Sequence, residues 1–444
     1  MVPIHMARSL PVSAQKSGPL LGKLRVPSDK SISHRALILG TSCVGETLVS
    51  NLLEAEDIMA TADAMRAMGG HIEKLDDGRW SITGVGSGGL VQPEKPLDFG
   101  NSGTGVRLCL GLVASHNMTV EFRGDSSLSK RPMGRVLKPL ADIGAVVNND
   151  HDCLPLTLTG ARDPLPIEYT LPVASAQVKS AILLAGLNTP GIMTVIEPEP
   201  TRDHTERMLS YFGVELSITH EARGRRIDLT GQPELRPGML NVPADPSSAA
   251  FPLVAALIVP GSDIVLTDVM LNPTRIGLIT TLKEMGAKIT LVDEREEGGE
   301  IIGDLRVEAS DLTGVQVPAS RAPSMIDEYP ILCVAAAFAS GETHMAGLGE
   351  LRVKESDRLA AMAAGLKACG VEHEEGEDSL IVCGKDSVPG GGTIKTHMDH
   401  RIAMAFLIMG LRSDKAISID DGAMIATSFP GFIEEMTALG ATFE

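Results

Sequence analysis

A short signature recurs six times along the chain, and it constrains the fold more than any other feature. Each copy is an apolar residue, then Gly, then a small residue, and it ends a segment with helical periodicity. The six glycines are Gly69, Gly144, Gly213, Gly286, Gly370 and Gly440. Their separations of 75, 69, 73, 84 and 70 residues are too even for chance matches. Since Gly suits the left-handed turn that ends many helices, we predict six structural repeats.

Each repeat has the same predicted order of elements. A helix of small apolar residues comes first and is followed by a strand, a second helix and two further strands, except that the sixth copy ends at Glu444. The first helices are expected to begin near Ser33, Thr104, Ser175, Ser247, Asp327 and Asp399. A unit this small cannot cover its own core, so neighbouring copies should pack together.

Three repeats on each side of a central boundary predict two α/β lobes. We expect a first lobe over 25–243 and a second lobe over 244–444, because Pro243 and Pro246 interrupt the pattern between the third and fourth copies. Residues 1–24 are expected to form an N-terminal tail and a strand that joins the second lobe. A length of 444 residues is compatible with two lobes of this size.

The composition disfavours several classes of partner. A formal net charge of -18 would repel nucleic acid and anionic membrane surfaces, and 3% aromatic residues offer no platform for stacking bases. No apolar run is long enough for a membrane-spanning helix, and the first residues lack the apolar centre of a signal peptide. Six cysteines without a CxxC pair indicate reduced thiols in or near the core. We therefore expect a cytoplasmic protein.

Basic and capping residues gather where the first helices begin, although the chain is acidic. Lys30 and Arg35 flank the first helix, whose serines can cap it, and Thr104 can cap the second helix after a glycine-rich turn. Ser175 precedes the third helix. Such helix starts suit a phosphate or a carboxylate. The fourth start, at 245–250, has caps but no cation, so a structural cap is the favoured interpretation there.

Carboxylates accompany cations in the second half. Asp327 and Glu328 lie where the fifth helix is expected to begin, and either could be only an N-cap. Lys354 and Arg358 are four residues apart and would share a helix face, which is either a solvated face or a site for proton transfer with anion binding.

Two motifs that could indicate a metal site or a dinucleotide site lack the surrounding sequence that such sites need. His397 and His400 lack a third ligand at metal spacing, so no metal is expected. The GxGxxG match at 84–89 is followed by a proline-containing segment rather than a helix, so we interpret it as a loop. No GxxxxGK[ST] sequence occurs, so the use of a nucleoside triphosphate has no support.

Seven separated motifs resemble one family, that of 5-enolpyruvylshikimate-3-phosphate synthase, from about Gly22 to Phe443. They are DKSISHR at 29–35, GNSGTG at 100–105, KRPM at 130–133, SAQVKSA at 175–181, PSMIDEYP at 323–330, KESDR at 354–358 and DHRIAM at 399–404. TRDHTE at 201–206 and MIATSFP at 424–430 are similar to the class II branch. The resemblance implies an α/β fold of two inside-out lobes, each with three βαβαββ units, that closes on its substrates.

The resemblance also implies a reaction. The 5-hydroxyl of shikimate 3-phosphate would add to C2 of phosphoenolpyruvate, and the adduct would lose phosphate, with no cofactor. Asp327 would take the hydroxyl proton, and Glu355, helped by Lys30 and beside Lys354, would exchange protons with the methylene carbon. Shikimate 3-phosphate would be held by Lys30, Ser31, Arg35, Ser175, Ala176, Gln177, Arg202, Asp327 and Lys354. Phosphoenolpyruvate would be held by Lys30, Gly103, Arg131, Gln177, Arg358 and Arg401.

Two departures from the family pattern affect these expectations. Class I members carry a Lys where this chain has Thr427, so no phosphoenolpyruvate contact is assigned there. Tolerant class II members often carry Ala where this chain has Gly103, so glyphosate should inhibit this chain more strongly than it inhibits them. A monomer is expected.

Two rival interpretations remain. One is the sister enzyme that transfers enolpyruvate to UDP-N-acetylglucosamine, which lacks the KRPM and DHRIAM motifs in this form. The other is a catalytically silent protein that binds phosphometabolites, and the presence of Asp327, Lys354 and Glu355 together argues against it.

Overall fold

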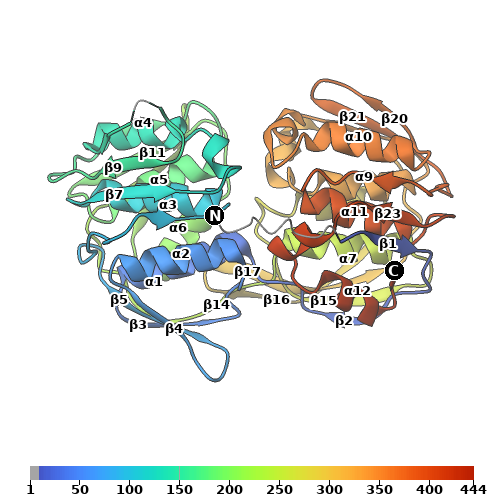
Figure 1. Ribbon diagram of the computed structural model, residues 1–444, viewed down its shortest axis with the longest axis horizontal. Helices are drawn as coiled ribbons and strands as arrows, with labels where there is room; N and C mark the ends of the chain where they lie inside the picture. Colours follow the sequence, from blue (N-terminus) through green and yellow to red (C-terminus); the bar gives the residue numbers. More distant parts are fainter. Residues whose placement is uncertain (1–9, 150) are drawn as a thin grey trace, which may run out of the picture. The chain divides into compact units, whose positions relative to one another are not determined.

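The structure, a computed structural model, describes residues 10–149 and 151–444, so residues 1–9 of the predicted tail lie outside the described residues. The chain divides into two compact units. We call Ser28–Pro243 with Glu296–Glu300 the first lobe (Figure 1). The second lobe holds the described residues up to Pro27, Ala244–Arg295 and Ile301–Glu444. Residues 25–27, which were expected in the first lobe, therefore belong to the second.

Each lobe contains three four-stranded sheets among the described residues. The first lobe has β14 (Met239–Asn241), β3 (Val44–Ser50), β5 (Trp80–Val85) and β4 (His71–Lys74), then β6 (Leu97–Asp98), β7 (Thr119–Arg123), β9 (Leu156–Thr159) and β8 (Val146–Val147), then β10 (Glu168–Thr170), β11 (Ile192–Glu197), β13 (Gly224–Thr230) and β12 (Leu216–Glu221), in spatial order.

The second lobe repeats this plan. Its sheets are β2 (Leu21–Leu24), β15 (Asp263–Met270), β17 (Glu300–Glu308) and β16 (Lys288–Glu297), then β18 (Gln316–Val317), β19 (Gly341–Ala346), β21 (Ser379–Gly384) and β20 (Glu372–Glu375), then β22 (Thr393–Ile394), β23 (Ile417–Ile419), β1 (Val12–Gln15) and β24 (Thr442–Phe443). In all six sheets the first pair of strands is parallel and the second pair is antiparallel. The predicted repeat is thus confirmed, with one further strand before each first helix.

The first helix of each repeat is buried and lies inside its lobe (Figure 1). These helices are α1 (Lys30–Ser42), α3 (Gly103–Ala114), α5 (Ala176–Gly186), α7 (Pro246–Ile258), α9 (Tyr329–Ala337) and α11 (His400–Gly410). All 13 residues of α7 and all nine of α9 are buried. A Cβ added at Gly111 of α3 would lie 2.3 Å from the Ala181 carbonyl oxygen of α5, so these two helices approach closely only because Gly has no side chain.

The second helix of each repeat ends at the predicted glycine. These helices are α2 (Glu56–Ala67), α4 (Gly134–Ile143), α6 (His204–Tyr211), α8 (Gly277–Glu284), α10 (Arg358–Ala368) and α12 (Phe432–Leu439). The six signature glycines all have positive φ, from +74° to +112°. The left-handed turn inferred from the sequence is therefore confirmed in every copy.

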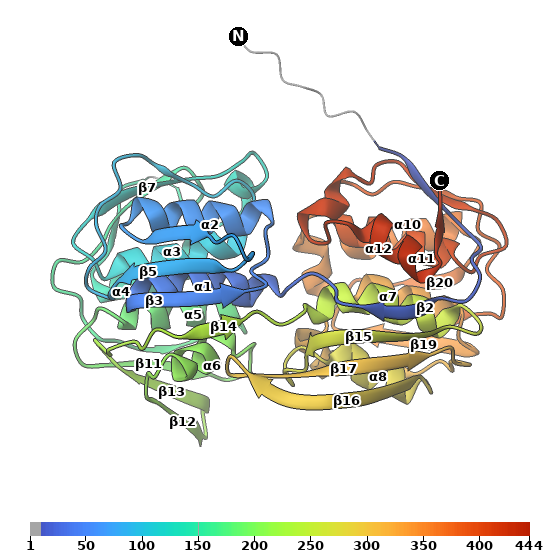
Figure 2. The same ribbon diagram turned by 90° about the horizontal axis from the view of Figure 1, so that it is seen from below.

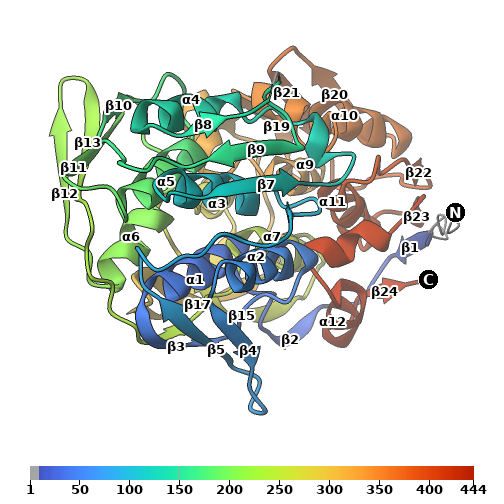
Figure 3. The same ribbon diagram turned by 60° about the vertical axis from the view of Figure 1, so that its left-hand side comes forward.

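Two strands belong to a different lobe from the helix that follows them in the chain. β2 precedes α1 in the chain but pairs in parallel with β15 of the second lobe, whereas β14, which precedes α7, pairs in parallel with β3 of the first lobe (Figure 2). β1 fills the last vacancy, between β23 and β24 (Figure 3). The sixth repeat, which lacks its own final strand, is completed by the segment around residue 13.

The structure also tests the predictions for the GxGxxG segment, the cysteines and membrane-spanning helices. Gly84 and Val85 of the GxGxxG segment end β5, and residues 86–96 contain no helix, so the rest of the segment is a loop as predicted. All six cysteines are free; Cys43, Cys109, Cys333 and Cys369 are buried, and the other two are half-buried. Among the residues that the structure describes, no helix is both long enough and apolar enough to cross a membrane.

Candidate active site

The first helix of the first lobe begins at Lys30 rather than near Ser33. Its cap is Asp29, whose Oδ1 accepts a hydrogen bond from the Ile32 N–H at 2.8 Å. The expected serine cap was wrong, because the Ser33 hydroxyl donates to the Asp29 carbonyl oxygen instead. A carboxylate caps a helix as well as a hydroxyl does, and both Lys30 and Arg35 remain in the first two turns.

Lys30 and Arg35 differ in how their charges are balanced. The Lys30 ammonium forms an ion pair with Asp57 of α2. Arg35 is 5% exposed, and its Nη1 donates to the Ser31 carbonyl oxygen at 2.9 Å. Burial lowers the pKa of Arg35 to about 10, which still leaves the guanidinium charged at neutral pH. Arg202, just before α6, lies close enough for its charge to add to this lowering of the pKa.

The starts of α3 and α5 are joined by a hydrogen bond. Ser102, not the expected Thr104, caps α3 by accepting from the Gly105 N–H at 3.2 Å. Thr104 instead accepts a hydrogen bond of 3.1 Å from the Gln177 side-chain amide in the first turn of α5. Ser175 caps α5 as predicted. The half-buried residues Ser175, Ala176 and Gln177 thus lie together at one helix start, and Gln177 links it to the next.

Two guanidinium groups lie beside Gly103. A Cβ added at Gly103 would be 3.0 Å from Arg107 Nη1 and 3.3 Å from Arg131 Nη1. Arg107 Nη1 donates to the Gly103 carbonyl oxygen at 3.1 Å, and Arg131 Nη2 donates to Asn101 Oδ1 at 3.1 Å. Burial, and then the charges of Arg131 and Arg135, lower the pKa of Arg107 to about 10. Arg107 was not among the predicted site residues, although its place at the end of the glycine-rich segment was a signal for it.

In the second lobe, two carboxylates share one guanidinium. Arg358 Nη1 is 3.3 Å from Asp327 Oδ1, and Arg358 Nη2 is 2.5 Å from Glu355 Oε2. Lys354 Nζ is also 3.4 Å from Asp327 Oδ1. The Arg358 side chain is 1% exposed, whereas those of Asp327 and Glu355 are 17% and 36% exposed. Four predicted residues therefore lie in one cluster, with both carboxylates reachable from solvent.

The local structure around this cluster differs from the prediction. Lys354 follows the 3-10 helix η3 (Gly349–Val353), and α10 begins at Arg358 with Asp357 as its cap. Lys354 and Arg358 therefore do not share a helix face. Both cations still reach Asp327, because the turn at 354–357 brings Lys354 back toward it.

Asp399 fixes the start of α11 and the buried guanidinium together. Its Oδ1 accepts from the Arg401 N–H at 2.9 Å, and its Oδ2 accepts from Arg358 Nε at 2.8 Å and from the Ser356 hydroxyl at 3.0 Å. Arg401 Nη1 donates to the Asp327 carbonyl oxygen at 3.0 Å. Arg401 is thus anchored next to Asp327.

The start of α7 carries a cation, although no basic residue lies near it in the sequence. Arg275, which is 4% exposed, donates from Nη2 to Asp245 Oδ1 at 2.9 Å and to the Ser247 hydroxyl at 3.0 Å. Ser247 donates to the buried Glu328, whose Oε1 is 3.7 Å from Arg401 Nη1. Arg275 lies 28 positions beyond Ser247 in the chain, so no local sequence signal linked them.

Charges around the cluster set the protonation of two of its groups. Partial burial favours the neutral form of Glu355, but the Arg358 guanidinium outweighs this effect and lowers the pKa of Glu355 below its usual range. Burial, together with Arg401 and Arg358, lowers the pKa of His400. At neutral pH, Glu355 is therefore a carboxylate and His400 is neutral.

A cluster outside the predicted site has metal-ligating atoms. Asp203, His204 and Glu300 place one such atom each within 4.8 Å of the others. The Arg207 Nε lies 2.9 Å from Asp203 and 3.8 Å from Glu300, so a cation already occupies this neighbourhood. His397 and His400 are not part of this cluster.

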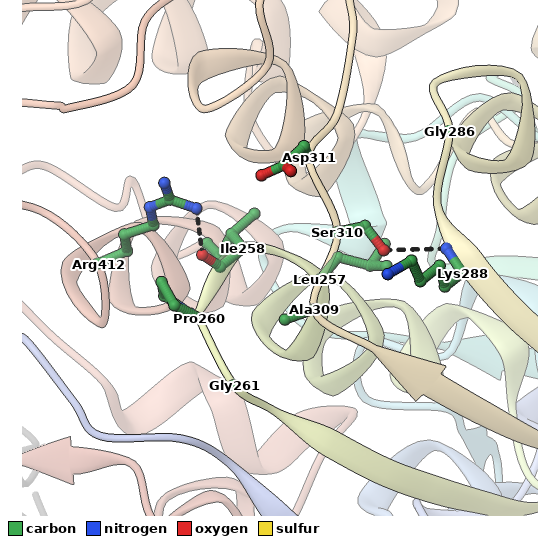
Figure 4. Close-up of a pocket in the computed structure, with 10 residues that line it drawn as sticks. All are labelled: Leu257, Ile258, Pro260, Gly261, Gly286, Lys288, Ala309, Ser310, Asp311 and Arg412. Carbon is green, nitrogen blue, oxygen red and sulfur yellow. Dashed lines mark hydrogen bonds between the residues drawn. The ribbon is translucent and has the colours of Figure 1, made fainter.

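A pocket of about 450 Å³ in the second lobe lies away from the predicted residues (Figure 4). Its lining includes Lys288, Ser310, Asp311 and Arg412, and Arg412 Nη1 donates to the Ile258 carbonyl oxygen at the end of α7. None of the predicted site residues lines this pocket. It therefore has no part in the candidate active site.

The two lobes differ in the chemistry that they offer. The first lobe presents Arg35, Arg107 and Arg131, none of which forms an ion pair with a described residue. Such groups bind phosphates and carboxylates. The second lobe presents the carboxylates of Asp327 and Glu355 held by cations, an arrangement suited to moving protons.

Comparisons with known proteins agree on one family. The model of the family "EPSP synthase (3-phosphoshikimate 1-carboxyvinyltransferase)" matches residues 14–436. A 3-phosphoshikimate 1-carboxyvinyltransferase of Parvibaculum lavamentivorans is 60% identical over 99% of this chain and 98% of its own. One of Rhodopseudomonas palustris is 61% identical over 98% of both chains. A solved EPSP synthase of Acinetobacter baumannii superposes with a TM-score of 0.89 at 45% identity, covering 98% of this chain and 99% of its own. The chain belongs to the EPSP synthase family.

Proposed function

We propose that the chain transfers the enolpyruvyl group of phosphoenolpyruvate to the 5-hydroxyl of shikimate 3-phosphate. The products are 5-enolpyruvylshikimate 3-phosphate and phosphate, on the shikimate pathway to chorismate and the aromatic amino acids. The observation that carries the proposal is the pair of carboxylates, Asp327 and Glu355, on the single buried guanidinium of Arg358. An addition followed by an elimination needs two groups that exchange protons at different atoms, and this pair provides them.

The proposed reaction has two steps. In the addition, the 5-hydroxyl oxygen bonds to C2 of phosphoenolpyruvate, Asp327 accepts the hydroxyl proton, and C3 gains a proton from Glu355. In the elimination, C3 returns a proton to Glu355, the C2–C3 double bond re-forms, the C2–O bond to phosphate breaks, and the departing phosphate takes up the proton that Asp327 had accepted. Because the pKa of Glu355 is low next to Arg358, we infer that Lys30 and the bound substrate help Glu355 to gain its proton.

The binding roles are divided between the lobes. Ser31, Arg35, the Ser175–Gln177 segment and Arg202 in the first lobe would hold shikimate 3-phosphate, with Lys30, Asp327 and Lys354. Gly103, Arg131, Arg358 and Arg401, again with Lys30 and Gln177, would hold phosphoenolpyruvate. Each charge-assisted hydrogen bond would contribute roughly 1.5–3 kcal/mol.

A phosphate-release assay tests the proposal directly. The purified chain is mixed with phosphoenolpyruvate and either shikimate 3-phosphate or UDP-N-acetylglucosamine, and phosphate is measured over time. We expect release with shikimate 3-phosphate only. No release with either acceptor, or release only with the UDP-sugar, would overturn the proposal.

We further propose that the chain acts as a cytosolic monomer. We also propose that glyphosate, a small anion, competes with phosphoenolpyruvate for its site. Light scattering of the eluted protein should give a mass near 46.8 kDa. A mass twice as large would exclude the monomer.

A further inference from the structure

Arg35 is a buried cation whose protein partners are all neutral. Its Nε donates to the Thr205 hydroxyl at 2.7 Å, its Nη2 to the Ser180 hydroxyl at 2.9 Å and its Nη1 to the Ser31 carbonyl oxygen at 2.9 Å. No described carboxylate forms an ion pair with it, although it is only 5% exposed. The nearest charges that favour its protonated form, those of Glu206, Asp29 and Glu300, act on Arg35 without a direct ion pair, so the donors of the guanidinium are held by neutral groups.

The two hydroxyls form one oriented network with the guanidinium. The Thr205 hydroxyl donates to Ser180 Oγ at 2.7 Å while it accepts from Arg35 Nε. Thr205 lies in the first turns of α6 and Ser180 lies in α5, so two helices hold the guanidinium of a third. The three bonds use three of the five N–H groups of Arg35, and the others remain for a ligand.

Buried ion pairs between neighbouring residues hold the helices that carry the two hydroxyls. Lys179, next to Ser180, lies 2.9 Å from Glu197 and 2.8 Å from Glu206, the residue after Thr205. Arg225 lies 3.3 Å from Glu197. Two cations thus balance two carboxylates, and these pairs fix α5 against α6; Glu206 acts on Arg35 through its charge but forms no ion pair with it. The position of both hydroxyls is therefore set by the fold.

We propose that Thr205 and Ser180 are positioning residues, which hold Arg35 through uncharged acceptors so that an anionic substrate is the first anion to hydrogen-bond with its guanidinium. This inference rests on the proposed function, in which Arg35 contacts shikimate 3-phosphate. A carboxylate in place of either hydroxyl would hold the guanidinium equally well but would compete with the substrate for its charge. Uncharged acceptors provide orientation without that competition.

Two variants of Thr205 separate charge from orientation. Thr205→Val keeps the shape and loses the acceptor, and it should raise the dissociation constant of shikimate 3-phosphate about tenfold. Thr205→Asp adds a charged acceptor and should raise that constant at least 100-fold while the melting temperature stays at or above that of Thr205→Val. Thr205→Ser should restore the wild-type affinity within about twofold. Calorimetry with shikimate 3-phosphate alone measures all three constants without turnover.

Thr189→Val is the matched control, because this buried threonine donates only to the Ala185 carbonyl oxygen within α5. It should leave the affinity for shikimate 3-phosphate unchanged, and the KM for phosphoenolpyruvate should stay within about twofold in every variant. Ser180→Ala, expected to weaken binding as Thr205→Val does, replaces any variant that fails to fold. Wild-type affinity in Thr205→Asp, or in both Thr205→Val and Ser180→Ala, would overturn the inference. Wild-type binding of shikimate 3-phosphate without phosphate release would instead contradict the proposed function alone.

Discussion

Arg358 donates to three carboxylates at once, those of Asp327, Glu355 and Asp399. A guanidinium can serve several acceptors because its donors point in fixed and different directions. Asp399 takes the deepest position and has no exposed side-chain surface, whereas the other two carboxylates are partly exposed. At the scale of residues, one buried cation thus places two carboxylates for chemistry and uses the third as its anchor.

Replacing Asp327 by Asn tests the proposed base. The amide keeps the size of the side chain but cannot accept the hydroxyl proton, so kcat for phosphate release should fall by about 10²- to 10⁴-fold. The dissociation constant of shikimate 3-phosphate, measured by calorimetry, should change much less. A kcat within tenfold of the wild type would remove Asp327 from this role.

Replacing Gly103 by Ala tests how the Gly103 position affects inhibition. The added methyl group would lie 3.0 Å from Arg107 Nη1 and 3.3 Å from Arg131 Nη1, so these groups must shift. We expect the inhibition constant of glyphosate to rise at least tenfold and the KM for phosphoenolpyruvate to rise less. Gly238→Ala, which meets nothing within 4 Å, is the control. A wild-type inhibition constant already in the tolerant range, and unchanged by Gly103→Ala, would contradict the expectation.

The sequence predicted which charged residues cluster in the second lobe, but it did not predict the residues that hold them in place. Asp327, Lys354, Glu355 and Arg358 do lie together, because they belong to compact motifs. Arg275 and Thr205 were missed as partners, because each acts on a residue far away in the chain and neither has a distinctive local pattern. Caps were misassigned for a related reason: several adjacent polar residues can cap a helix, and only the backbone geometry decides among them.

At the scale of elements, the glycine after each second helix is the feature that the sequence predicted best. A left-handed residue interrupts the helical period at a defined place, so it can be recognised locally. Strands of two to four residues, such as β6 or β22, carry no periodicity of their own. Their partners are decided by packing over long sequence distances, and for that reason the pairing of β14 with β3 could not be predicted.

Gly286→Ala tests the left-handed turn by itself. Gly286 has a φ of +96°, and an added Cβ would meet only the Asp311 carbonyl oxygen at 3.5 Å, an ordinary contact. The free energy of unfolding, measured by urea denaturation, should fall by about 1–2 kcal/mol because a side chain disfavours this conformation. Gly18→Ala, at a position without positive φ or close neighbours, should leave it nearly unchanged. Equal effects of the two substitutions would contradict this account.

At the scale of the whole molecule, three neutral histidines make stability depend on pH. Burial lowers the pKa of His34, His116 and His400 below 6.5. Below pH 6.5 the unfolded chain therefore binds protons that the folded chain does not, so stability is present above that pH and is lost as the pH falls. Each histidine contributes at most about 1.4 kcal/mol per pH unit.

Urea midpoints at pH 7.5, 6.0 and 5.0 test this expectation. They should decrease in that order, and the decrease should be smaller in His34→Gln, which removes one titrating group. Carboxylates such as Glu355, whose pKa is lowered, lose their contribution to stability only at pH below 4.5. They therefore do not affect the comparison between pH 7.5 and 5.0. A midpoint that rises between pH 7.5 and 5.0 would refute the assignment.

The placement of β1 has a consequence for how the protein is made. Ser13 and Glu444 exchange backbone hydrogen bonds of 2.7 and 2.8 Å, so a segment translated early is paired with one translated much later. On the ribosome, β1 and β2 leave the exit tunnel before the strands that flank them in the second lobe exist. The first lobe, apart from its hairpin tip at Glu296–Glu300, can assemble during translation. The second lobe needs strands from both ends of this order, so its folding should be completed only after β24 has left the exit tunnel.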